Sequence, residues 1–173
     1  MRRRLLFYAA SLIAVATCAF SQQAKTSGQL KVLEGAELGR LLPQNFFYAG
    51  QTAPVQARNA AAARTPAGKY VLAGLVDSSG YSTALAEKYQ GFVILEQAAS
   101  IGGHRLSPGA YGIGSLADGS FVLSDLGGNT LVTTPLVNDS KMRRPRPLQI
   151  SVAENKLRLY LGRKYVDLEF DAQ

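Results

Sequence analysis

The chain has 173 residues, of which 47% are hydrophobic, and this length and composition are typical of one domain with an apolar core. A single cysteine, Cys18, and a single histidine, His104, exclude an internal disulfide framework and argue against a zinc or copper site. The formal net charge of +7 includes the arginines at positions 2–4, so the rest of the chain is only moderately basic and does not indicate a nucleic-acid-binding protein.

The N-terminal residues have the layout of a secretory signal peptide. Three arginines at positions 2–4 precede an uncharged apolar run from Leu5 to Phe20, and small residues lie near its end. We expect cleavage after Ser21, or alternatively after Ala19, and export to the periplasm or the medium. An uncleaved membrane anchor and lipidation of Cys18 are the alternatives, although the apolar run is shorter than the ~20 residues that span a bilayer comfortably.

Three regions follow from this pattern. We assign residues 1–21 to the signal peptide, 22–52 to an N-terminal extension and 53–173 to a β-domain. Spaced leucines in the extension predict one short helix at 35–42, where two glycines lower the helix propensity.

Short apolar or alternating runs separated by turn residues fill the β-domain. Strands near 53–64 and 69–76, joined by a turn at 65–68, are predicted to form a hairpin. Gly102-Gly103 and Asp118-Gly119 are typical hairpin turns. Further strands are predicted at 92–96, 110–116, 120–126, 130–134, 148–153, 156–161 and 164–170.

These elements predict a mainly β protein, an antiparallel meander with one or two short helices. A long meander must close or fold into two layers, because open strand edges promote aggregation. The sequence is equally compatible with a small barrel and with a barrel-like sandwich.

Several segments of the β-domain resemble a family of short secreted bacterial proteins of unassigned function. They are GKYVLAGLVDSSGYS from Gly68, YQGF from Tyr89, IGGHRLSPGAYGIG from Ile101, FVLSDLGG from Phe121 and LRLYLGRKYV from Leu157. The resemblance implies a periplasmic or secreted β-domain and carries over no activity and no site residue.

A polar insert between two apolar strands is the first candidate site. Its proposed ligand-binding residues, together with an aspartate at the end of a later strand, are Asp77, Ser78, Ser79, Tyr81, Ser82 and Asp125. Asp77 and Asp125 would serve as the carboxylate pair of a glycan-active enzyme if their strands ended side by side. Alternatively, each aspartate caps the turn that follows it.

A basic segment at 141–147 that contains two prolines is the second candidate site. Its cations, proposed to contact an anionic partner, are Lys141, Arg143, Arg144 and Arg146. Guanidinium groups bind phosphate, sulfate or carboxylate oxygens in pairs, so an anionic glycan, a lipid headgroup or an envelope protein is the expected kind of partner. A solvated loop is the alternative, and the scarcity of aromatic residues here argues against nucleic acid.

The remaining catalytic signatures are missing from the sequence. No G-x-S-x-G segment accompanies His104, and Gly112-Ile113-Gly114 lacks the further glycine of a phosphate-binding loop. We expect no metal and no cofactor. The sequence therefore favours a non-catalytic binding or interaction module of the cell envelope. The alternatives are the carboxylate-pair enzyme and a structural accessory domain that docks through Phe46-Phe47-Tyr48.

Overall fold

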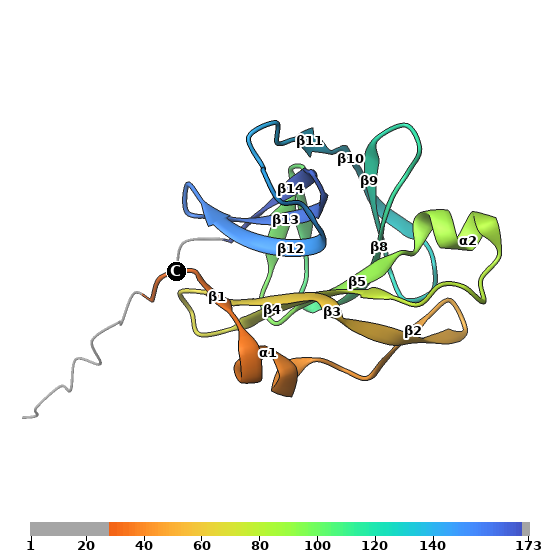
Figure 1. Cartoon of the computed structure of the whole chain (residues 1–173), viewed down its shortest axis with the longest axis horizontal. Helices are drawn as coiled ribbons and strands as arrows, with labels where there is room; N and C mark the ends of the chain where they lie inside the picture. The colour runs from red at the N-terminus through yellow and green to blue at the C-terminus, as the bar shows by residue number, and fades with distance from the viewer. Residues whose placement is uncertain (1–27, 171–173) are drawn as a thin grey trace, which may run out of the picture.

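The computed structural model describes residues 28–170 and shows a mainly β protein built from two antiparallel sheets and two short helices (Figure 1). The predicted signal peptide, 1–21, lies outside the described residues. The predicted class, an antiparallel β protein with one or two short helices, is confirmed at this level.

The first sheet has eight strands, and neighbours on its main path follow the order β1-β3-β4-β5-β8-β9-β10, with β2 beside β3. Its strands are β1 (Lys31–Leu33), β2 (Asn45–Tyr48), β3 (Gln51–Arg64), β4 (Tyr70–Val76), β5 (Gly91–Leu95), β8 (Gly109–Ser115), β9 (Ser120–Ser124) and β10 (Thr130–Pro135). The predicted hairpin around 65–68 is formed by β3 and β4.

The second sheet has six strands in the order β12-β13-β14-β6-β7, with β11 beside β14. Its strands are β6 (Ala99–Ile101), β7 (His104–Leu106), β11 (Val137–Asn138), β12 (Arg146–Ala153), β13 (Lys156–Gly162) and β14 (Lys164–Glu169). Within residues 28–170 no strand pairing joins the two sheets, so they pack as a sandwich and are not closed into a barrel.

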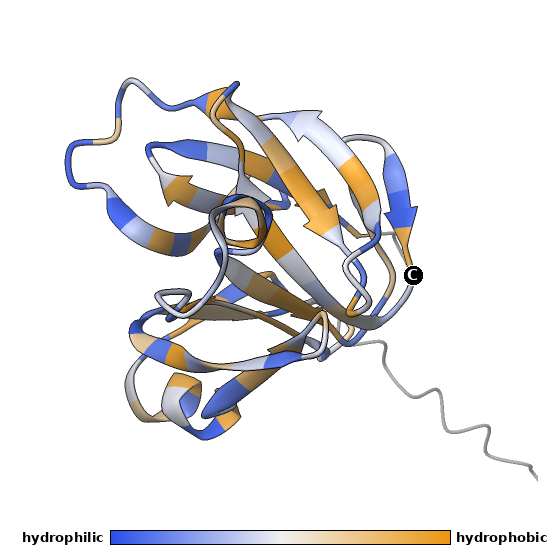
Figure 2. Ribbon diagram, turned by 90° about the vertical axis from the view of Figure 1, so that its right-hand side faces the viewer, coloured by the Kyte–Doolittle hydropathy of each residue, from blue (hydrophilic) through white to orange (hydrophobic). Residues whose placement is uncertain are grey.

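The main core lies between the sheets and takes buried hydrophobic residues from both. Figure 2 shows hydrophobic positions along the strands of both layers. Because side chains alternate along a strand, Ala61 and Ala63 of β3 point into this core, as do Leu157 and Leu159 of β13. All four side chains are almost fully buried. The alternation of apolar residues along the strands therefore accounts for the face-to-face packing of the two sheets.

The opposite face of the first sheet carries two smaller clusters. Helix α1 (Gly35–Leu41) packs leucines against Ala62 and Leu72. Beside it, five aromatic side chains gather: Phe46, Tyr48, Tyr81, Tyr89 and Phe92. Phe46 and Tyr48 are buried, whereas Phe47 is 53% exposed, so the Phe46-Phe47-Tyr48 run is mainly core and not an aromatic docking patch.

The boundary placed at residue 53 does not separate two structural units. β1 and β2 lie in the supposed extension, yet both pair with β3 in the first sheet. Strands of three and four residues are too short to show a clear alternation, and the glycines of the helix between them obscure the pattern. The predicted helix at 35–42 is confirmed as α1.

The polar insert connects β4 to α2 (Thr83–Lys88), which leads directly into β5. Ser82 occupies the N-cap position of α2, although its side chain donates and accepts no capping hydrogen bond. The helix lies over the aromatic cluster, and its Leu85 packs against that cluster.

A candidate anion-binding groove

A groove of about 690 Å³ lies along one side of the sandwich, where the two sheets meet. One wall consists of Val32–Gly35 at the end of β1 and the start of α1, together with part of β3. The other wall consists of the basic segment and the first half of β12. We call it the seam groove. Its volume is in the range of natural ligand-binding clefts.

Three arginines line the seam groove, and they come from both of its walls. Arg58 lies on β3, Arg146 is the first residue of β12, and Arg144 lies in the bend that precedes β12. Glu34 is the only acidic residue among the lining residues. The groove therefore carries an excess of positive charge, which favours an anionic occupant.

None of these arginines forms an ion pair with another residue of the described part of the chain. Over residues 28–170, the ion pairs are Lys31–Glu37, Lys156–Glu169 and two contacts of Arg158, with Glu154 and Asp167. Acidic residues thus neutralise the far end of β13 and leave the groove arginines available for a ligand. Their guanidinium groups each offer several N–H donors to oxygen acceptors.

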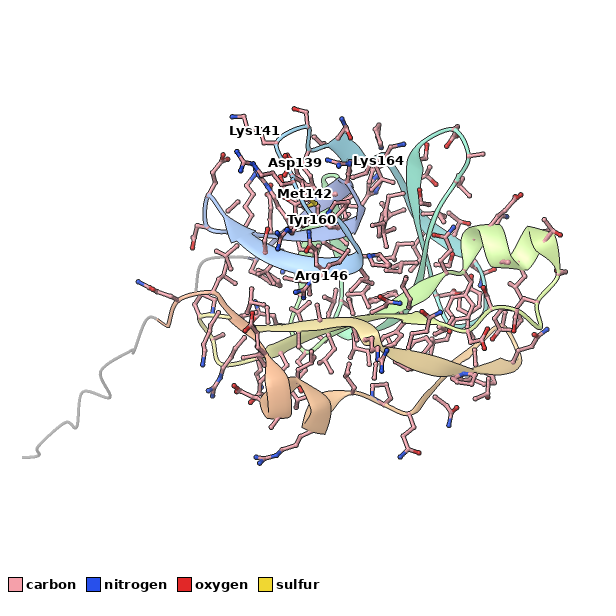
Figure 3. The ribbon with its side chains drawn as sticks, in the orientation of Figure 1. Asp139, Lys141, Met142, Arg146, Tyr160 and Lys164 are labelled. Atoms are coloured by element: carbon pink, nitrogen blue, oxygen red, sulfur yellow. The ribbon has the colours of Figure 1, made fainter. Side chains whose placement is uncertain are left out.

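The basic segment is held in place by Asp139, which lies among the residues labelled in Figure 3. One carboxylate oxygen of Asp139 accepts a hydrogen bond from the Lys141 amide at 3.0 Å, and the other accepts one from the Tyr160 hydroxyl at 3.1 Å. The Arg163 guanidinium donates to the Met142 carbonyl. These bonds fix the turn that precedes Arg144, so the segment is an ordered part of the sandwich.

The four cations predicted to contact an anionic partner divide into two pairs. Arg144 and Arg146 line the seam groove, whereas Lys141 and Arg143 are exposed and do not line it. Arg58 was not predicted, because its position opposite the basic segment depends on the packing of β3 against β12. An exposed arginine in an alternating strand gives no local signal of such a role.

Asp77 in the polar insert acts as a turn cap. Its carboxylate accepts a hydrogen bond from the Ser79 amide at 3.1 Å, and the hydroxyl and amide of Ser79 lower the pKa of Asp77. The Ser78 carbonyl accepts a hydrogen bond from the Tyr81 amide and closes the turn. None of the predicted insert residues lines the seam groove.

Asp125 has the same structural role at the end of β9. It accepts hydrogen bonds from the side chain and the amide of Asn129, both at 2.9 Å, and these bonds lower the pKa of Asp125. A general acid needs a raised pKa to hold its proton at neutral pH. The environments of Asp77 and Asp125 shift the pKa in the opposite direction.

The turns that follow the two aspartates attach to the β2–β3 hairpin at different points. The Asp77 amide donates to the Pro54 carbonyl in β3, whereas the Ala49 amide at the tip of the hairpin donates to the Leu126 carbonyl, next to Asp125. These separate attachments favour two turn-capping aspartates over a carboxylate pair.

Tyr81 turns away from solvent and joins the aromatic cluster. Its ring lies 5.7 Å from that of Tyr89, which stacks on Tyr48 at 4.1 Å. The hydroxyls of Tyr81 and Tyr89 and that of Ser124 are buried without a hydrogen-bond partner in the described residues. Burial raises the pKa of both tyrosines.

His104 lies on the opposite side of the sandwich. With Arg105 and Leu131 it lines a smaller groove of about 340 Å³ between β7 and β10. In the described part of the chain no three histidine, cysteine or acidic side chains are arranged to hold a metal ion. No helix between residues 28 and 170 is long and apolar enough to cross a membrane.

Comparisons with protein-family models, with curated proteins and with solved structures found no match to this chain.

Proposed function

We propose that this protein is an exported, non-catalytic binding module of the cell envelope that holds an anionic partner in the seam groove. One observation carries the proposal: three arginines without ion-pair partners in the described chain, Arg58, Arg144 and Arg146, line the same groove from opposite walls. Export is inferred from the charged and apolar pattern of residues 1–21.

Two features favour binding over catalysis. Both aspartates of the expected carboxylate pair accept turn hydrogen bonds that lower their pKa, whereas a general acid needs a raised pKa. The groove itself combines arginines with an apolar floor that includes Leu33 and Leu148. Such a surface suits recognition of a partner with charged and apolar groups.

A pair of neighbouring arginines provides a matched test. Arg143 and Arg144 carry the same charge in the same ordered segment, but only Arg144 lines the groove. Each is changed to Ser, and the salt concentration that elutes the mature protein from immobilised heparin is measured. Arg144→Ser and Arg58→Ser are expected to elute at clearly lower salt than the unchanged protein, and Arg143→Ser close to it.

Equal effects of the three substitutions would show that retention follows total charge and not the groove. Circular dichroism and thermal melts of each variant establish that it is folded. The exposed position of all three arginines makes large losses of stability unexpected.

A further inference from the structure

The walls of the seam groove are strand edges. β1 is the last strand of the first sheet, and β12 is the last strand of the second. Leu148, Gln149 and Ile150 all line the groove although successive side chains of a strand point to opposite faces. Three consecutive lining residues therefore place the edge of β12, with its backbone N–H and C=O groups, along the groove.

Within the described chain this edge of β12 has no strand partner, because β12 pairs only with β13. Free strand edges are templates for a further strand, and extended peptides use them in several recognition modes. The seam groove lies between this edge and strands β1 and β3 of the first sheet, which pack against β12 but form no strand ladder with it.

The cations at the groove entrance are two residues apart in the sequence. Arg144 lies in the bend before β12 and Arg146 is the first residue of β12, with Pro145 between them. In an extended peptide, alternate side chains share one face, about 6.6 Å apart. Acidic residues at alternate positions would thus face both guanidinium groups at once.

We propose that the partner of the seam groove is an acidic protein segment that binds in extended form and adds a strand to the free edge of β12. The proposal rests on the anion-binding function and deepens it by assigning the partner. Carboxylates of the segment pair with Arg58, Arg144 and Arg146, and its alternate apolar side chains enter the floor near Leu148. No aromatic residue lines the groove, so a sugar ring finds no aromatic face to pack on.

The same arrangement selects against a second copy of the chain. Arg146 and Pro147 at the start of β12, together with Arg144 just before it, make this edge repulsive to another basic edge, which is how natural proteins protect edges from self-association. An acidic strand is not repelled by these cations. The edge therefore favours a partner of opposite charge over a second copy of this chain.

The test uses a fluorescein-labelled octapeptide of alternating Glu and Val, with binding followed by fluorescence anisotropy. Two further peptides carry N-methyl groups either on the Glu or on the Val residues, so that each loses the N–H donors of one edge and keeps its charge. Strand addition predicts that one methylated peptide binds at least tenfold more weakly and that the other binds within threefold of the parent.

The arginine variants and hydrogen exchange complete the test. Arg144→Ser is expected to weaken binding of the parent peptide at least fivefold, and Arg143→Ser less than twofold. In hydrogen exchange, the backbone amides of 146–153 are expected to exchange more slowly in the complex than in the free protein. Equal binding of both methylated peptides, or equal loss in both, would overturn strand addition.

Two outcomes separate failure of this inference from failure of the proposed function. If the peptide does not bind but a heparin hexasaccharide binds and depends on Arg144, the peptide inference is wrong and the anion-binding groove stands. If neither probe distinguishes Arg144→Ser from Arg143→Ser, both proposals are wrong.

Discussion

Two rings of the aromatic cluster, those of Tyr48 and Phe92, pack directly against glycines of the first sheet. A Cβ atom at Gly112 would lie 2.3 Å from the Tyr48 ring, and one at Gly74 would lie 2.9 Å from the Phe92 ring. The cluster therefore needs glycine at these points of the sheet. Sequence patterns locate such glycines in a strand but do not identify the ring that occupies the space above them.

Gly112→Ala is expected to destabilise the protein by about 1 to 3 kcal/mol, because the Tyr48 ring and its stacked partner must move. Urea unfolding followed by circular dichroism measures the change. Gly39→Ala in α1 is the matched control, since no atom lies within 4 Å of its added Cβ. That change is expected to stabilise by up to about 1 kcal/mol through helix propensity. A neutral Gly112→Ala would contradict the packing described here.

Tyr89→Phe tests the cost of a buried hydroxyl that lacks a partner. Removal of the Tyr89 hydroxyl is expected to stabilise the protein by about 1 kcal/mol at pH 7, because the folded state no longer buries an unsatisfied donor. Urea unfolding at several pH values measures the difference. A variant that is less stable at pH 7 would show that the hydroxyl has a partner.

The difference in folding stability between Tyr89→Phe and the unsubstituted protein is expected to depend on pH. Burial raises the pKa of Tyr89, so the folded protein keeps the phenolic proton while the unfolded chain loses it above about pH 10. Stability of the unchanged protein then falls by up to about 1.4 kcal/mol per pH unit from this residue alone. The gap between Tyr89→Phe and the unchanged protein should widen between pH 10 and 11.

At the scale of elements, the turn before β12 decides where the groove arginines lie. Asp139 joins this turn to β13 through the Tyr160 hydroxyl, and the Asp139 amide donates to the Arg163 carbonyl at 2.9 Å. The basic segment is thereby tied to the hairpin of β13 and β14. Its order is the condition for presenting Arg144 and Arg146 to the groove.

The Asp139→Ala variant distinguishes the effect of the geometry of the basic segment on anion binding from the effect of its net charge. Loss of an acidic residue beside the basic segment would raise anion affinity if net charge alone mattered. We expect affinity for the Glu–Val octapeptide to fall about threefold or more instead, because the loop loses two hydrogen bonds and its fixed geometry. Asp118→Ala, at a turn outside the basic segment, is the control and should leave affinity nearly unchanged. Tighter binding by Asp139→Ala would favour a purely electrostatic effect.

At the scale of the whole molecule, two sheets pack face to face and leave their outer strand edges at the sides of the sandwich. The seam groove occupies one such side and the smaller His104 groove the other. A ligand in the seam groove would touch β3 of one sheet and β12 of the other. Binding is thus expected to couple the two layers and stabilise the fold by mass action.

Long alternating strands made much of this architecture predictable. The hairpin of β3 and β4 and the C-terminal strands show apolar alternation over several residues, and turn residues such as Gly68, Asn155 and Gly162 mark their ends. β1 and β2 were missed as strands because three or four residues carry little periodic signal. Local pattern also gives no register between distant strands, so the sandwich could not be distinguished from a barrel.

The candidate site was only partly predictable for the same reason. Arg144 and Arg146 stand out in the sequence because basic residues and prolines cluster there. Arg58, on the facing wall, lies far from them along the chain and is brought near only by tertiary packing. Asp77 and Asp125 each follow an apolar strand, and the hydrogen bonds by which each caps its turn are not evident from that pattern.

Hydrogen–deuterium exchange of the chain without residues 1–21, with and without saturating Glu–Val octapeptide, tests the central claim most directly. The account predicts slower exchange in 31–35, in the neighbourhood of Arg58 and in 146–153, and unchanged exchange in 77–83 and 125–129. Slower exchange confined to 77–83 and 125–129, or no change anywhere at a saturating concentration, would contradict it.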